Sequence, residues 1–371
     1  MLIKTLGFPK ITNFAGDIRE FLPSLFEYLR QYDECKIYLE KGYGTGFGLK
    51  SADYLKANNK IEFVSTEDTF KKDLVVILKM PDMEKLELLK DGNIFFSMCH
   101  FPTQTKNVEL FKRKDIQAFS MDSITDDYGI RLFVDYFRTS YNACKMAFKE
   151  LEKTMKNMYS KNRKPINAVI VGVGGAAQKA ARALEIIGDN AFLGKDIPGI
   201  LIKMLPKTIT YDESLMIPIL TDTDILIDAS RRTGNDLKKP IIKNELLGYM
   251  PKHAVICDIS LDCYSDDGQV KPFEGTVCGS LSKPVIYPDD HRYDIQLPEG
   301  ISSKNRRITV GCDAWPGITP KESILHYENI IKDYLTILLT KDIDNLEKNS
   351  NNPFERALYR SSLKDYLETK Q

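Results

Sequence analysis

The sequence predicts an α/β protein built from two domains with largely parallel sheets. Short apolar runs alternate with amphipathic stretches, a pattern typical of a parallel sheet with helices on its faces. The chain has 371 residues, which is enough for about two domains. One long helical stripe separates the two blocks in which this alternation occurs.

The first block contains five predicted strands. The helical stretch between the first two begins at Pro23, because proline fits the first turn of a helix, where its missing N–H matters least. Leu25 and Leu29 share one face of that helix. The predicted strands are Leu2–Phe8, Cys35–Glu40, Ile61–Ser65, Leu74–Lys79 and Ile94–Cys99.

A long helix follows, with apolar residues from Phe137 to Met155 at alternating steps of four and three. It runs into the basic segment Lys156–Pro165, which we interpret as the boundary between the domains. The alternative is an ordinary loop inside one domain. The second block then contains the predicted strands Ala168–Val171, Ile200–Met204, Asp224–Asp228, His253–Ile259, Val285–Tyr287 and Arg307–Gly311.

The composition excludes several classes of function. Lys plus Arg and Asp plus Glu both number 52, and a formally neutral chain without a basic block argues against nucleic-acid binding. The longest apolar runs, such as Leu74–Leu78, are far shorter than the roughly 20 residues of a membrane span. The first ten residues do not resemble a signal peptide. We therefore expect a cytoplasmic protein that acts on small molecules.

Seven cysteines are scattered along the chain without a C-x-x-C pair. This pattern predicts reduced, mostly buried thiols of a cytoplasmic protein. The four histidines have no zinc-ligand spacing to one another or to a cysteine pair. We therefore expect no metal site.

The segment from Gly172 to Ala177 has the pattern G-x-G-x-x-A between a predicted strand and a predicted helix. Gly172 permits a tight turn, and Gly174 lets the backbone approach a pyrophosphate. The helix N-terminus supplies N–H donors to phosphates. We expect a dinucleotide here; a tight turn without a ligand is the alternative. The expected cofactor-binding residues of the turn are Gly172, Gly174, Gly175, Ala176 and Ala177.

The end of the next strand bears on the choice between NAD and NADP. An acidic residue at this place binds the ribose hydroxyls in NAD-binding proteins. The strand Ile200–Met204 ends without one, Lys203 and Lys207 lie there instead, and Asp212 comes later. The pattern slightly favours NADP, with Lys207 as a cofactor-binding residue. NAD remains the alternative.

Polar side chains at strand ends are candidates for chemistry. Lys79 ends one predicted strand and His100 follows the next. Ligands of open α/β sheets bind outside the carboxyl ends of strands, so both are candidate acid–base groups. Arg19, before the first helix, could hold a carboxylate with two hydrogen bonds. Each also has a bland interpretation as an ordinary solvated or hydrogen-bonded side chain.

Several segments together resemble a known family. They are Arg19–Pro23, Glu40–Leu55, Asp73–Pro81, Phe96–Pro102, Asp126–Arg131, Ile256–Asp262 and Asp313–Pro320. Over roughly residues 1–340 the chain resembles the alanine dehydrogenase and pyridine nucleotide transhydrogenase superfamily. Within it, the chain is most similar to the saccharopine dehydrogenase (lysine-forming) and lysine–2-oxoglutarate reductase branch.

This resemblance implies two Rossmann-like domains flanking a cleft, with the last helix returning to the first domain. The implied substrate domain comprises residues 1–140 and 321–371, and the implied NAD(P)-binding domain comprises residues 141–320. The substrate would lie between the domains, under the nicotinamide. The family also suggests a homo-oligomer.

The resemblance further implies roles for individual residues. Lys79 and His100 would be catalytic and move protons while an imine forms. Arg19 and Lys79 would hold the carboxylate or carbonyl of the substrate. Arg131 could hold a second carboxylate, and Asp262 would lie by the nicotinamide ribose.

The chain departs from the saccharopine pattern at several positions. Thr103 stands where that branch has a lysine, and Asp122 is the nearest match to a substrate-binding glutamate. Arg138 and Tyr141 stand where small residues are expected. The alanine dehydrogenase D-Q-G-G pattern after the aspartate is also missing. These departures leave the substrate open.

The preferred interpretation is an NAD(P)-dependent oxidoreductase acting on the C–N bond of an amino acid, of the saccharopine type, which condenses an amino acid with a 2-oxo acid. The first alternative is an amino-acid dehydrogenase that uses ammonia, like alanine dehydrogenase. The second is a dinucleotide-binding regulator without catalysis. The expected partners are an amino acid and a 2-oxo acid.

Overall fold

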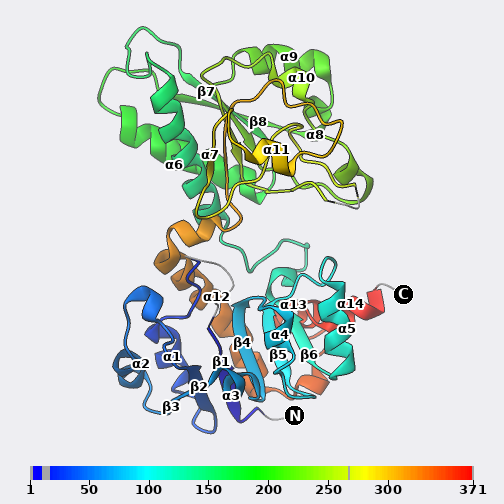
Figure 1. Cartoon of the computed structure of the whole chain (residues 1–371). Coiled ribbons are helices and arrows are strands. Elements are labelled where there is room, and N and C mark those ends of the chain that lie inside the picture. The colour runs from blue at the N-terminus through cyan, green and yellow to red at the C-terminus, as the bar shows by residue number, and fades with distance from the viewer. Residues whose placement is uncertain (1–2, 11–16, 266–267, 370–371) are drawn as a thin grey trace. The chain divides into compact units, whose positions relative to one another are not determined.

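The computed structural model describes residues 3–10, 17–265 and 268–369 and divides into two compact units. Unit 1 comprises Met1–Asp135 with Pro320–Gln371, and unit 2 comprises Tyr136–Thr319. Each unit is a sheet with helices on its faces (Figure 1). The division falls after residues 135 and 319, whereas the sequence led us to expect it after residues 140 and 320.

The segment 156–165 lies inside unit 2, so its interpretation as the boundary between the domains is wrong. Arg163 is buried there, and its guanidinium donates to the carbonyl oxygens of Met158 and Pro198. Its guanidinium carbon also lies 4.8 Å from the ring centre of Phe192. The basic composition therefore reflects an anchored loop, which was the alternative interpretation.

The sheet of unit 1 has six parallel strands in the order β3-β2-β1-β4-β5-β6. Its last strand escaped the sequence analysis because it is short and only partly apolar. The outer edge of that strand is paired by a C-terminal segment, where the N–H of Ser120 donates to the carbonyl of Ser361 at 2.8 Å. The strands are β1 (Thr5–Phe8), β2 (Lys36–Glu40), β3 (Ile61–Val64), β4 (Leu74–Lys79), β5 (Ile94–Met98) and β6 (Gln117–Ser120).

Both faces of this sheet are buried, as the alternation along β4 shows. Leu74, Val76 and Leu78 contribute to one apolar cluster and Val75 and Ile77 to another. The helices are α1 (Pro23–Leu29), α2 (Ser51–Ala57), α3 (Thr66–Phe70), α4 (Met83–Leu86), α5 (Thr105–Arg113), α12 (Pro320–Thr340), α13 (Pro353–Arg360) and α14 (Leu363–Thr369).

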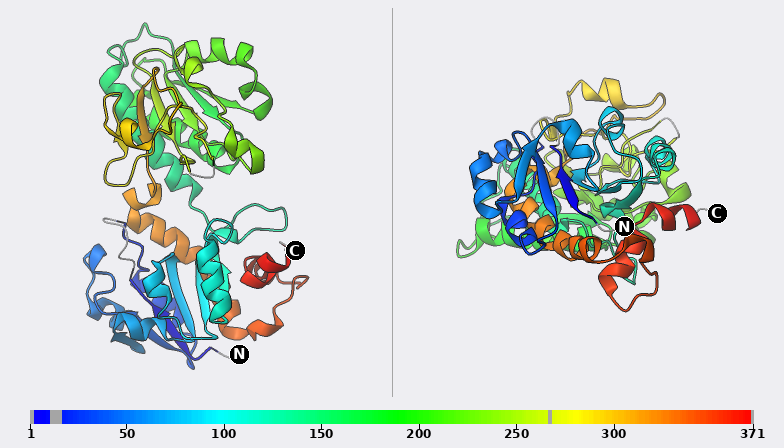
Figure 2. Two further views of the ribbon diagram at one scale, coloured as in Figure 1. Left: turned by 45° about the vertical axis from the view of Figure 1, so that its right-hand side comes forward. Right: turned by 90° about the horizontal axis from the view of Figure 1, so that it is seen from below.

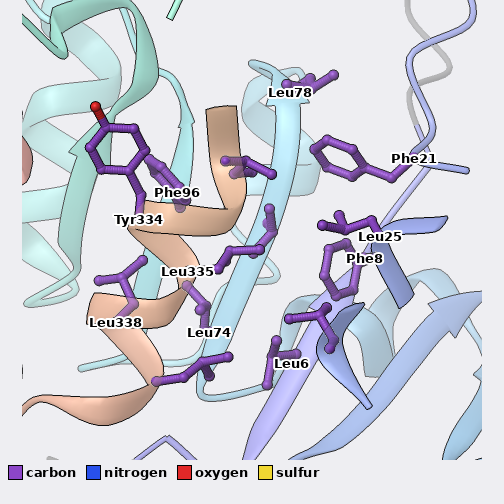
Figure 3. Close-up of a cluster of buried hydrophobic side chains, with 14 of the residues drawn as sticks. Leu6, Phe8, Phe21, Leu25, Leu74, Leu78, Phe96, Tyr334, Leu335 and Leu338 are labelled. Carbon is purple, nitrogen blue, oxygen red and sulfur yellow. The ribbon is translucent and has the colours of Figure 1, made fainter. Parts of the chain in front are cut away.

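Helix α12 packs on unit 1, which confirms the expected return of the last long helix. Figure 2 shows this orange helix lying against the strands of unit 1. Its residues Tyr334, Leu335 and Leu338 face Leu74 and Phe96 of the sheet (Figure 3). The C-terminal part of the chain is therefore part of the first core.

Unit 2 has a second six-stranded sheet in the order β11-β12-β10-β9-β7-β8, parallel except for the pair β11 and β12. The strands are β7 (Ile166–Val171), β8 (Ile200–Leu205), β9 (Ile225–Asp228), β10 (Val255–Asp258), β11 (Val285–Ile286) and β12 (Ile308–Gly311). The helices are α6 (Tyr136–Thr154), α7 (Gly175–Phe192), α8 (Lys207–Thr210), α9 (Glu213–Thr221), α10 (Asn244–Leu247) and α11 (Arg292–Gln296).

The strand order of unit 2 reverses at β7, because the chain goes first to β8 on one side and then to β9 on the other. Such a switch point is where ligands bind in open α/β sheets. The two sheets confirm the expected pair of Rossmann-like domains. A cleft between the domains stays a prediction.

The cysteines differ from the expectation of reduced thiols. Cys263 and Cys278 form a disulfide, with their Cα atoms 6.2 Å apart, and the other five cysteines are buried free thiols. Sequence spacing could not show this pair, because two cysteines 15 residues apart meet only through the tertiary structure. Disulfides are rare in cytosolic proteins, so the cysteine pattern gives no support to a cytoplasmic location.

No helix in the described part of the chain is long and apolar enough to cross a membrane. The described residues likewise contain no group of three or more His, Cys, Asp or Glu side chains arranged to hold a metal ion.

The core of unit 1 gives a test of the return of α12. Leu335 is fully buried, whereas Leu325 on the same helix is 41% exposed. Replacing Leu335 with alanine should lower the free energy of unfolding by about 2–5 kcal/mol, because it removes buried methyl groups and leaves a cavity. The matched Leu325→Ala change should cost less than about 1 kcal/mol. Urea unfolding followed by circular dichroism measures both, and equal costs would contradict the packing described.

Candidate active site

Lys79 and His100 lie at the same edge of the unit 1 sheet. Lys79 is the last residue of β4, and His100 follows the end of β5 by two residues. The two strands are parallel neighbours, with Lys79 paired with Met98 after an irregularity that begins at Val76. The structure therefore brings both predicted catalytic residues to the carboxyl edge of one sheet.

Asp17 joins Arg19 to Lys79. One carboxylate oxygen of Asp17 lies 2.5 Å from Nε of Arg19, and the other lies 3.1 Å from Nζ of Lys79. The Asp17 side chain is 1% exposed, and that of Lys79 is 25% exposed. A buried carboxylate between two cations offsets their positive charge and fixes the positions of the guanidinium and the ammonium. The result is a cationic pair held in place near the strand end.

His100 is held by Asp122 in two ways. Its backbone N–H donates to Oδ1 of Asp122 at 3.1 Å, and its ring Nδ1 lies 3.2 Å from Oδ2. The backbone of His100 has a φ of +46°, a conformation that costs energy for a residue with a side chain. Ser120 also donates to Asp122. Burial opposes ionisation, but the bonds from His100 and Ser120 outweigh it and lower the pKa of Asp122 to about 2.

Arg131 belongs to the same cluster. Its Nε donates to the backbone oxygen of Asp122 at 3.0 Å. The turn before it is closed by Asp126, whose carboxylate accepts the N–H groups of Tyr128 and Ile130. The structure therefore brings His100, Asp122 and Arg131 together.

In unit 2, the glycine-rich turn has the geometry that a dinucleotide needs. Gly172 has a φ of +117°, and a Cβ atom there would lie 2.6 Å from the carbonyl oxygen of Ala229. A Cβ at Gly174 would meet nothing within 4 Å, so this side of the turn is open. Gly174 also precedes the 18-residue helix α7 without a side-chain cap. The first N–H groups of α7 are therefore available to phosphate oxygens.

The remaining residues of the motif pack as expected. Ala177 is fully buried against the sheet, and Ser140 of α6 donates to the carbonyl oxygen of Ala176 at 3.0 Å. Small residues thus allow α7 to approach β7 closely. These observations fit a bound dinucleotide.

Asp262 lies beyond the end of β10 and is held by Arg232. Nη2 of Arg232 is 3.0 Å from Oδ2 of Asp262, and the Arg232 side chain is 2% exposed. The same guanidinium donates to the carbonyl oxygens of Lys239 and Val270. This buried anchor leaves the Asp262 carboxylate partly exposed at the strand end.

A buried charge cluster lies behind Asp262. Asp258 accepts the N–H of Leu261 at 2.7 Å and the Lys271 ammonium at 2.6 Å. Leu261 has a φ of +53°, so this carboxylate also holds a left-handed turn. Asp228, paired with Asp258 in the sheet, accepts hydrogen bonds from Ser230 and Ser260. Burial and the nearby Asp258 charge raise the pKa of Asp228 to about 6.

Comparison with known proteins shows what this chain is similar to. Residues 21–134 match the family model "Alanine dehydrogenase/PNT, N-terminal domain". This segment of unit 1 is therefore similar to the N-terminal domain of that family. An alanine dehydrogenase of Methanococcus maripaludis is 25% identical over 89 residues, which are 24% of this chain and 24% of that protein.

Solved structures show the same fold over nearly the whole chain. An L-alanine dehydrogenase aligns with a TM-score of 0.70 and 17% identity, covering 96% of this chain and 94% of the other. A transhydrogenase from Sinorhizobium meliloti aligns with a TM-score of 0.57 and 14% identity, covering 90% and 95%. These similarities do not reach the saccharopine branch, which stays a hypothesis.

The segment that matches the family model contains most of the predicted substrate site. Lys79, His100, Asp122 and Arg131 lie within the matched residues, and Arg19 lies just before them. The structure groups these residues into two clusters, one around Asp17 and one around Asp122.

Sequence analysis named Asp122 but missed Asp17, which holds Arg19 and Lys79, and the carboxylates at the ends of β9 and β10. Asp17 gave no signal, because an aspartate two residues before an arginine is common. Asp228 ends one predicted strand and Asp258 is the next-to-last residue of another, and this similar position was a usable signal. Arg232 and Lys271 could not be found, because their partners are distant in sequence.

The raised pKa of Asp228 gives a test of this cluster. Between about pH 4 and 6 the folded state holds the Asp228 proton more tightly than the unfolded state, so this group makes stability fall as pH rises. Asp228→Asn should remove this decrease in the free energy of unfolding, which is at most about 3 kcal/mol. Urea unfolding at pH 4, 5, 6 and 7 measures it, with the exposed Asp289→Asn as the charge-matched control. Parallel pH profiles for the wild type and Asp228→Asn would rule the assignment out.

Proposed function

We propose that the chain is an NAD(P)-dependent oxidoreductase that interconverts an amino acid and its 2-oxo acid with ammonia, as an alanine-dehydrogenase-type enzyme does. One observation carries the proposal. A histidine held by a buried carboxylate and a lysine held by a second one lie at one strand edge of the segment that matches the alanine dehydrogenase/PNT N-terminal domain. The similarity to alanine dehydrogenases favours this reaction over saccharopine chemistry.

The cationic pair of unit 1 would hold the substrate. The guanidinium of Arg19 matches a carboxylate in shape and charge, and Asp17 fixes its orientation. The Lys79 ammonium can donate to the carbonyl oxygen of a 2-oxo acid, which makes the carbonyl carbon more electrophilic. Asp17 uses one oxygen for each cation, so it holds both groups in place.

His100 would move the proton. Imidazole is the side chain that most readily gains and loses a proton near neutral pH. Asp122 lies at Nδ1 and fixes the ring, which leaves Nε2 as the nitrogen for proton exchange with the substrate amine and with water. The low pKa of Asp122 keeps its carboxylate ionised, so it can accept the hydrogen bond that orients the ring.

Unit 2 would hold the dinucleotide. When bound, NAD(P)⁺ accepts a hydride from the substrate Cα and returns it in the reverse direction. Gly172, Gly174 and the first turn of α7 would bind the pyrophosphate through backbone N–H groups. Asp262, anchored by Arg232, would accept hydrogen bonds from the nicotinamide ribose.

A second candidate function is supported by Arg131. Its guanidinium lies beside Asp122 in the same cluster as His100 and is only partly buried. A second carboxylate, such as that of a saccharopine-type product, would find a partner there. An enzyme that uses ammonia has no such need. The non-catalytic regulator remains the third outcome of the test below.

The activity test uses purified full-length protein and follows NADH and NADPH at 340 nm. One mixture supplies a panel of 2-oxo acids with ammonia, and the other supplies the same acids with amino acids such as lysine. Turnover with ammonia alone supports the proposal. Turnover only with an amino-acid partner, lost in Arg131→Ala, supports the second candidate. Nucleotide binding without turnover in either mixture indicates the regulator.

His100→Ala should lower kcat by about 10²–10⁴-fold, because it removes the acid–base group. His291→Ala is the matched control, since the His291 side chain is 71% exposed, and it should leave kcat unchanged. Steady-state kinetics of both variants with the active mixture measure the difference. Equal kcat values for wild type and His100→Ala would remove His100 from the mechanism.

A further inference from the structure

A cavity of about 280 Å³ lies beside the glycine-rich turn of unit 2. It opens between the turn, the segment after β8 and the loop after β9. A dinucleotide whose pyrophosphate lies on Gly172 and Gly174 would place its adenosine near the end of β8. The lining residues that the argument uses are Lys207, Tyr211, Ser230, Arg231 and Asp236.

The end of β8 lacks the group that selects NAD. NAD-binding proteins place a carboxylate there, which accepts the ribose hydroxyls and repels a 2′-phosphate. Here β8 ends at Leu205 and is followed by Pro206 and Lys207. The Lys207 ammonium lies 5.4 Å from the ring centre of Tyr211, so a cation and an aromatic surface stand side by side in the cavity.

Arg231 brings a second cation into the same cavity. It is exposed on the loop after β9. The neighbouring Arg232 has a different role, because its guanidinium is buried and bonded to Asp262. Arg232 thus anchors Asp262, whereas the exposed Arg231 is available to a ligand in the cavity.

One carboxylate also lines the cavity and offsets part of its positive charge. Asp236 lies 2.6 Å from Nζ of Lys207. An ammonium has three N–H donors, and Asp236 uses one of them. Arg232 is paired with Asp262, so the remaining charges of the lining are the cations Lys207 and Arg231 against the carboxylate of Asp236. The balance favours an anion.

We propose that this cavity takes the 2′-phosphate of NADP(H), with Lys207 and Arg231 as the residues that select it over NAD(H). The inference rests on the dinucleotide binding that the proposed function requires. Ser230, whose hydroxyl is oriented by Asp228, lies in the same lining and adds a polar group to the pocket. Adenine would lie near the Tyr211 ring.

Equilibrium titration of the full chain with NADPH and NADH, followed by nucleotide fluorescence, tests the inference. NADPH should bind at least about tenfold more tightly, since Lys207 and Arg231 would form charge-assisted hydrogen bonds with its 2′-phosphate. The affinity for NADPH should also fall more steeply with salt. Adenosine 2′,5′-bisphosphate should compete better than adenosine 5′-monophosphate.

Variants of opposite charge sharpen the test. Lys207→Ala and Arg231→Ala should each lower the NADPH-to-NADH affinity ratio, whereas Asp236→Asn should raise it. Lys195→Ala, an exposed lysine of unit 2 outside the cavity, is the control and should leave the ratio unchanged.

The outcomes separate the two proposals. NADH binding as tightly as NADPH, or a ratio that shifts in the same direction in Lys207→Ala and Asp236→Asn, overturns the 2′-phosphate site and leaves the proposed function standing. Failure of both nucleotides to bind overturns the proposed function and this inference with it.

Discussion

A carboxylate that accepts the backbone N–H of a residue just beyond a strand end sets the geometry of both candidate sites. Asp122 does so for His100 in unit 1, and Asp258 does so for Leu261 in unit 2. Both recipients have positive φ, which costs about 1–2 kcal/mol for a residue with a side chain. A hydrogen bond to an ionised carboxylate is strong enough to offset that cost. The strained turn then presents His100 in one unit and Asp262 in the other.

The charges around these turns are paired before any substrate arrives. Asp17 joins Arg19 and Lys79, and Lys271 joins Asp258. Removing one partner of a buried pair leaves an uncompensated charge and costs more than the pair contributes. Substitutions at Asp17 or Asp258 should therefore damage stability and chemistry together. Exposed His100 is a cleaner probe of chemistry, because its side chain is about half exposed.

Much of the fold could be read from the sequence, because the alternation of apolar runs and helical stripes reports burial directly. The glycine-rich turn was readable for the same reason, since only glycine fits the close approach of Gly172 to Ala229. The strand β6 was missed because it has only four residues and is only partly apolar. The Cys263–Cys278 bond and the Asp17 cluster were missed because they depend on tertiary contacts rather than on a local pattern.

The crystal structure of the Asp122→Ala variant tests the central claim most directly. Without the carboxylate, the N–H and the ring of His100 lose their shared partner. The account predicts that His100 leaves the left-handed region and its imidazole moves, while β5 and Cys99 keep their positions. If His100 keeps a φ near its present +46° and its ring stays in place, Asp122 does not set the geometry of the site.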